Sequence, residues 1–190
     1  VVGIKPTFGL VSYTGIMGLD PTLDHIGPMT RTVADNALFL EVLAGPDGCD
    51  SRQRGVRADR YLRNLEAGIG NLRVGIVDEG FDMPMSEPEV DRGVRQAITK
   101  LAKLGADVEL VSIPWHAYGG ALWAVASFEA SYHTYVYGGG MFTEGLSVPS
   151  LVPAMNAATA RMNEFADTVK VSLLLGRHAV QSCAGGFYGK

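Results

Sequence analysis

A strand–helix–strand pattern over residues 72–113 constrains the fold of this chain more than any other feature. Residues 72–77, LRVGIV, are typical of a strand, and residues 107–113, DVELVSI, partly alternate as a second strand before a proline. Between them, apolar side chains recur at helical spacing, namely Val90, Val94, Ala97, Ile98, Leu101 and Leu104. A crossover helix between two strands favours a right-handed parallel βαβ unit, so the pattern predicts an α/β fold.

The ends of this helix carry their own signals. Ser86 and Glu89 have the spacing of a capping box, and Pro88 suits the first helical turn. Gly105 is a typical stop signal, and the acidic turn at residues 78–80 separates the first strand from the helix. We therefore expect the helix to begin at the capping box and to end before Gly105.

The first 35 residues predict a short strand, a loop and the start of a helix. The apolar run at residues 1–4 ends at Pro6, which lacks an N–H and pushes the residue before it toward an extended backbone. Glycines and prolines then recur too densely for a long helix or strand, at Gly9, Gly15, Gly18, Pro21, Gly27 and Pro28. Thr32 and Asp35 form an acidic variant of the capping box, which predicts a helix from Thr32 to Gly45.

Polar side chains inside these loops are interpreted as structural. Asp24, His25 and Arg31 stand among tight turns, where such residues usually hydrogen-bond the nearby backbone. Residues 47–71 are polar and charged, which predicts a surface loop and a short helix whose apolar anchors are Tyr61, Leu62 and Leu65.

Three blocks in order resemble the amidase signature family: G-I-K-P-T-x-G-x-V-S, L-D-H-I-G-P-M-T-R-T-V-x-D, and A-G-P-D-G-C-D-S-R at residues 44–52. The similarity is greatest to amidases that act on products of nitrile hydratase, and it continues to the terminal FYGK. The resemblance implies a mixed β-sheet sandwiched between helices. Residues 1–190 are then expected to form one partial amidase domain, an internal fragment from the middle of a longer enzyme.

The same resemblance implies a Ser–Ser–Lys mechanism that passes through a serine acyl-enzyme. No position of this chain matches any of those three residues, so no catalytic residue is assigned here, and the fragment alone is expected to be inactive. Lys5 and Ser12 could be considered as a local dyad. We favour a structural Lys5 paired with a carboxylate or carbonyls, because a lysine base needs a lowered pKa that no sequence feature supplies.

Two other functions remain open. One is a non-catalytic scaffold or binding module with the amidase fold. The other is a protein like the glutamyl-tRNA amidotransferase subunit that releases ammonia from glutamine, which resembles the same blocks. The segment Pro114–His116 is more similar to the nitrile-linked amidases, so hydrolysis of a small carboxamide to acid and ammonia is the preferred function.

Trp123 is the candidate substrate-binding residue, since bulky amides need a wide apolar wall beside the scissile bond. It stands in a predicted helix that begins near Ala121 and ends at Gly138–Gly140, and whose aromatic residues otherwise fit core packing. A second, long amphipathic helix is predicted from Pro149 to about Leu175, with its methionines as core filler.

The composition of the chain disfavours some classes of binding partner. A net charge of -4 disfavours nucleic acid and anionic membranes, and no apolar run approaches the ~20 residues that a membrane helix needs. Two distant cysteines, Cys49 and Cys183, are expected to be reduced thiols in a cytoplasmic protein. A homodimer is one candidate assembly.

No metal or cofactor is expected. Paired-histidine and paired-cysteine motifs are missing from the sequence, as are an EF-hand loop and a glycine-rich nucleotide loop. The four histidines are His25, His116, His133 and His178.

Overall fold

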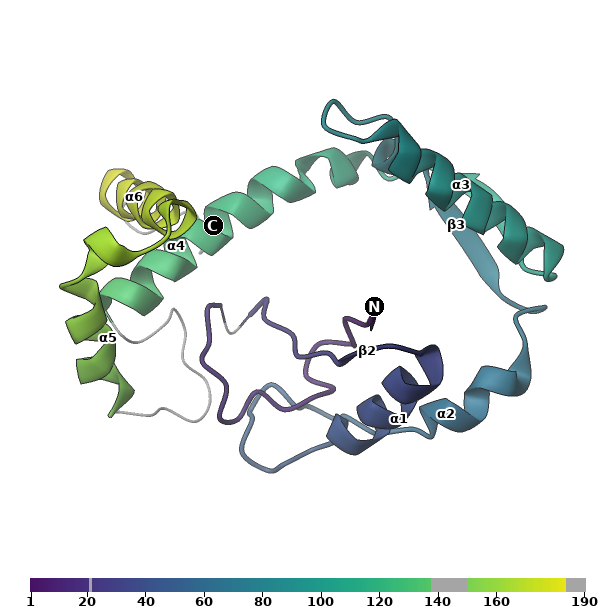
Figure 1. Cartoon of the computed structure of the whole chain (residues 1–190), viewed down its shortest axis with the longest axis horizontal. Helices are drawn as coiled ribbons and strands as arrows, with labels where there is room; N and C mark the ends of the chain where they lie inside the picture. The colour runs from purple at the N-terminus through teal and green to yellow at the C-terminus, as the bar shows by residue number, and fades with distance from the viewer. Residues whose placement is uncertain (21, 138–149, 184–190) are drawn as a thin grey trace. The chain divides into compact units, whose positions relative to one another are not determined.

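The computed structural model describes residues 1–20, 22–137 and 150–183. The chain divides into two compact units, one made of Val1–Asn64 and Trp123–Lys190 and the other of Leu65–Leu122 (Figure 1). The expectation of a single domain over residues 1–190 stays a prediction. The glycine turn predicted at 138–140 and the terminal FYGK lie outside the described residues.

The unit Leu65–Leu122 contains the predicted βαβ arrangement. Strands β3 (Arg73–Val77) and β4 (Asp107–Val111) pair in parallel, in a register that places Arg73 opposite Asp107 and Val77 opposite Val111. Helix α3 (Pro88–Lys103) connects them, as Figure 1 shows. The α/β class is therefore confirmed.

The start of α3 differs from the prediction. Glu87 is the N-cap and makes no side-chain capping bond, so the Ser86–Glu89 capping box is wrong. Pro88 sets the start, because proline suits the first helical position and leaves Ser86 one residue too far upstream to cap. The Ser86 hydroxyl instead donates to Asp91 Oδ1 at 3.0 Å.

Strand β4 ends at Val111, two residues earlier than predicted, because the next two residues bond elsewhere. The Ser112 hydroxyl and the Ile113 N–H both donate to the Glu79 carboxylate, which lies in the 3-10 turn η2 (Asp78–Gly80). A second 3-10 turn, η3 (Pro114–Tyr118), follows.

The first part of the other unit agrees with the predicted strand, loop and helix. Strand β1 (Val2–Gly3) pairs antiparallel with β2 (Met29–Thr30), and helix α1 (Val33–Leu43) follows. Thr32 caps α1 as predicted, since its Oγ1 accepts the N–H of Asp35 at 3.0 Å. The segment 47–71 contains only the short helix α2 (Tyr61–Asn64) and the 3-10 turn η1 (Leu65–Ala67).

Where one long helix was predicted from residue 149 to 175, the structure has two. Helix α5 (Leu151–Thr159) and helix α6 (Asp167–Ser182) are separated by the 3-10 turn η4 (Met162–Glu164). An extended backbone at Phe165 makes the break, and Asp167 then occupies the first turn of α6, where a carboxylate is favourable. In the sequence, the spacing of the charged residues around Asp167 fits the interior of one long helix as well as the start of a new one.

Helix α4 (Gly119–Tyr137) packs closely against α6. A Cβ built on Gly176 would meet the Phe128 carbonyl oxygen and would lie 2.7 Å from Tyr132 Cβ, and Gly176 is buried together with Leu173 and Ala179. Glycine is thus required at this crossing. Across the described residues, no helix combines the length and apolar character needed to span a membrane.

Candidate functional site

Trp123, the predicted substrate-binding residue, lies near the start of α4 with 63% of its surface exposed. It is therefore accessible to a ligand, but its role stays a prediction. Tyr132 and Tyr135, further along α4, are half-buried, and Tyr135 makes an edge contact with Phe165 at 6.2 Å between ring centroids.

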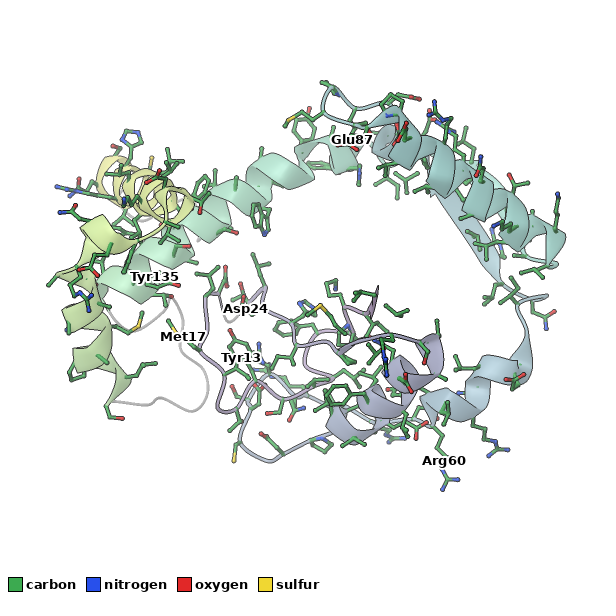
Figure 2. The ribbon with its side chains drawn as sticks, in the orientation of Figure 1. Tyr13, Met17, Asp24, Arg60, Glu87 and Tyr135 are labelled. Atoms are coloured by element: carbon green, nitrogen blue, oxygen red, sulfur yellow. The ribbon has the colours of Figure 1, made fainter. Side chains whose placement is uncertain are left out.

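Many polar contacts of the described residues gather in three loop segments, namely 8–14, the described residues 19–20 and 22–25, and 44–53, which we call the loop clamp. Asp24 holds the second segment: its Oδ2 accepts the N–H groups of Leu19 and Asp20, both at 2.8 Å. The Tyr13 hydroxyl donates to the same oxygen (Figure 2). The interpretation of Asp24 as a structural, backbone-bonding residue is confirmed.

The Asp50–Arg52 ion pair lies at the centre of the loop clamp. Arg52 donates through Nη2 at 2.7 Å and through Nε at 2.9 Å, and the side chains of Arg52 and Asp50 are only 8% and 4% exposed. The guanidinium carbon lies 4.1 Å from the Tyr13 ring centroid and 5.4 Å from that of Phe8. A planar cation between two rings and a carboxylate joins segments that are about forty residues apart in sequence.

Asp47 and Gln53 close the third segment onto the first. Asp47 Oδ1 accepts the N–H groups of Cys49 at 2.8 Å and Asp50 at 2.9 Å, while Oδ2 accepts the Ser12 hydroxyl. Gln53 Nε2 donates to the carbonyl oxygens of Gly9 at 3.0 Å and Gly45 at 2.7 Å. The first and third segments of the loop clamp therefore each donate a hydrogen bond to the other: Ser12 donates to Asp47, and Gln53 donates to Gly9.

Lys5 and Ser12 do not form a dyad with each other. Lys5 Nζ lies 3.4 Å from His25 Nε2, and Ser12 bonds to Asp47. His25 Nδ1 donates to the Leu23 carbonyl at 2.6 Å, which leaves Nε2 to accept from the lysine. The expected carboxylate or carbonyl partner of Lys5 is wrong: an imidazole takes that place.

Helix α4 is joined to the loop clamp within the same unit. The Thr134 hydroxyl donates to the Leu19 carbonyl at 2.9 Å. Eleven residues separate Trp123 from Thr134, which corresponds to about 16 Å along a helix. Trp123 thus stands on the same helix as this contact, about three turns away.

Electrostatics favour the ionised carboxylates in the loop clamp. Hydrogen bonds from Arg52 hold the pKa of Asp50 below its ordinary value, and the hydroxyls of Ser12 and Thr14, followed by backbone N–H groups, lower that of Asp47. Burial, and then the hydrogen bond to Asp24, raises the pKa of Tyr13, so its hydroxyl remains a proton donor.

These shifts predict acid destabilisation of the loop clamp. Because the folded pKa values of Asp47 and Asp50 are lowered, their stabilisation is complete above the unfolded value of about 4 and is lost as the pH falls through the folded values. The denaturant midpoint, followed by circular dichroism, should fall below pH ~4. Asp50→Asn should be less stable at neutral pH and should lose less on acidification; an equal acid loss in both proteins would contradict the assignment.

The sequence did not single out Arg52, Gln53 or the pairing of Tyr13 with Asp24. The one local signal was the spacing of Asp50 and Arg52, two residues apart in a turn-forming block. Within the part of the chain that the structure describes, no three His, Cys, Asp or Glu side chains are grouped so as to hold a metal ion. The arrangement is suited to fixing the backbone after β1 rather than to bond-breaking chemistry.

Comparison with known proteins gives a consistent result. The amidase family model matches residues 1–186. An enantioselective amidase of Rhodococcus rhodochrous is 40% identical over 195 residues, which cover 99% of this chain and 37% of that protein. A glutamyl-tRNA(Gln) amidotransferase subunit of Rubrobacter xylanophilus is 39% identical over 189 residues, with 99% and 38% covered.

A solved structure of a related protein is also similar to this chain. The corresponding glutamyl-tRNA(Gln) amidotransferase subunit of Thermotoga maritima superposes with a TM-score of 0.63 at 26% identity, over 97% of this chain and 35% of that one. The chain therefore spans less than two fifths of the length of the proteins that it matches.

Proposed function

The chain belongs to the amidase family, and on this premise we propose that it forms part of an amidase that hydrolyses a carboxamide to a carboxylic acid and ammonia. The observation that carries the proposal is the match over residues 1–186. The 40% identity to an enantioselective amidase supports a small-molecule amide as the substrate.

In the proposed reaction, a serine hydroxyl attacks the amide carbon, the C–N bond breaks and ammonia leaves, and water then hydrolyses the acyl-serine ester. The serine, its bridging serine and the lysine base have no counterpart in residues 1–190. We assign this chain a supporting part: the loop clamp fixes the segment after β1, and Trp123 provides an apolar wall for the acyl group. The protein is proposed to be cytoplasmic and to need no cofactor, metal, nucleic acid or membrane; a homodimer fits this proposal.

A chimeric enzyme tests the proposal. Residues 1–190 would replace the matching segment of the Rhodococcus rhodochrous amidase, and ammonia release would be measured with aliphatic and aromatic amides. We expect hydrolysis by the chimera and none after its nucleophilic serine is changed to alanine. A folded chimera that hydrolyses no amide, beside an active parent enzyme, would support the non-catalytic scaffold instead.

The amidotransferase alternative is favoured by one specific observation. The 39% identity to a glutamyl-tRNA(Gln) amidotransferase subunit is almost equal to the 40% identity to the amidase. Ammonia release from glutamine alone, with no hydrolysis of simple amides, would support this alternative.

Trp123→Ala in the chimera should change acyl-group selectivity. Loss of an apolar wall should raise KM for bulky amides and shift the ratio of kcat/KM between aromatic and short aliphatic amides by about tenfold. Trp115→Ala is the matched control, because Trp115 is also exposed, at 77%, and no contact with substrate is proposed for it. If the Trp123 variant keeps the selectivity of its parent, Trp123 has no part in substrate binding.

A further inference from the structure

Residues 54–63, RGVRADRYLR, form a cationic segment in an otherwise acidic chain. The segment carries four arginines, no lysine and a single aspartate, whereas the whole chain has a net charge of -4. All four arginines are exposed, and Arg60 projects away from the ribbon just before α2 (Figure 2). Among the described residues, no acidic side chain forms an ion pair with Arg57, Arg60 or Arg63.

The spacing and anchoring of this arginine segment favour display of its charges on one surface. Arg57, Arg60 and Arg63 are three residues apart and exposed; Arg63 lies in α2 (Tyr61–Asn64), and Arg57 and Arg60 lie in the irregular stretch just before it. Helix α2 is fixed to α1, because the Leu62 N–H donates to Glu41 Oε1 at 2.7 Å. Helix α2, which carries Arg63, is thus anchored beside the exposed Arg60.

The chemistry of the arginine segment favours carboxylates on a protein. Guanidinium groups bind carboxylates in a bidentate manner, and arginine together with tyrosine is enriched in protein interfaces. Tyr61 and Leu62 stand between Arg60 and Arg63 and add apolar contact area. A nucleic acid is less suited, because a single half-buried tyrosine offers no platform for stacking bases.

We propose that the arginine segment is a docking surface for an acidic segment of a partner protein. This proposal goes beyond amide hydrolysis, and none of the segment's residues belongs to the loop clamp.

Binding of a labelled oligoglutamate peptide to the 190-residue chain tests this proposal. Fluorescence anisotropy would be measured at low and at physiological ionic strength. The triple variant Arg57→Gln, Arg60→Gln, Arg63→Gln should bind about tenfold more weakly, because it loses its charged contacts. The control triple Lys100→Gln, Lys103→Gln, Arg177→Gln removes the same charge from exposed sites elsewhere and should keep the parent affinity. A triple Arg→Lys variant should bind with intermediate affinity, because lysine keeps the charge but loses the planar fork.

Three results would overturn the proposal: no binding of the peptide, an equal loss in both Gln triples, or tighter binding of a single-stranded RNA of equal charge through the same arginines. The last result would identify a nucleic-acid surface. If the chain alone aggregates, the same variants would be tested in the chimeric enzyme. In the chimera without these substitutions, absence of peptide binding with amide hydrolysis intact would contradict the docking proposal and leave the proposed amidase function standing.

Discussion

Arg52→Ala should destabilise the chain by about 3–4 kcal/mol, because it leaves the buried Asp50 carboxylate without its cation. The same change removes the cation stacked on the rings of Tyr13 and Phe8, which joins segments far apart in sequence. Denaturant unfolding followed by circular dichroism would give the change in free energy. Hydrogen exchange at the Tyr13 amide, which donates to Asp50 Oδ2 at 2.8 Å, would localise it.

Arg161→Ala is the matched control for this prediction. The Arg161–Glu164 pair is exposed, at 70% and 60% of the two side chains, so its loss should cost far less than the loss of the buried pair. Arg52→Lys should be intermediate, since lysine keeps the charge but cannot form the fork to Asp50. Similar losses for Arg52→Ala and Arg161→Ala would show that the loop clamp does not depend on the buried pair.

Gly176→Ala should destabilise the packing of α4 on α6 by about 1–3 kcal/mol. The added methyl group would meet the Phe128 carbonyl oxygen and Tyr132 Cβ, and neither atom can move away by rotating a side chain. The two helices would have to separate, which also loosens the contacts of the buried Leu173 and Ala179. The measurement is the denaturant midpoint, together with hydrogen exchange along α6.

Gly93→Ala is the opposite case and serves as the control. Gly93 also lies inside a helix, α3, but among the described residues no atom apart from its chain neighbours and the adjacent backbone of its own helix lies within 4 Å of the position of its Cβ. Alanine there should raise stability by about 0.5–1 kcal/mol through helix propensity alone. If Gly176→Ala is as stable as the parent chain, the close approach of α4 and α6 does not require glycine.

Local sequence patterns predicted those helices and strands whose positions depend on neighbouring residues. The parallel pairing of β3 and β4 across α3 followed from strand and helix periodicity, and the start of α1 followed from Thr32 and Asp35. The failures were also local in origin. The α3 start depends on a choice between two adjacent cap positions, Ser86 and Glu87, and the break between α5 and α6 has no glycine or proline to mark it.

The sequence by itself predicted the family and the α/β class, because each depends on motifs or on periodicity. Only the tertiary structure decided which loop residues meet: Arg52 with Asp50, Tyr13 and Phe8, Asp47 with Ser12, and His25 with Lys5. It also decided which glycines can accept a side chain. The physical reason is that such contacts depend on how distant segments cross, and many crossings are compatible with the same local preferences.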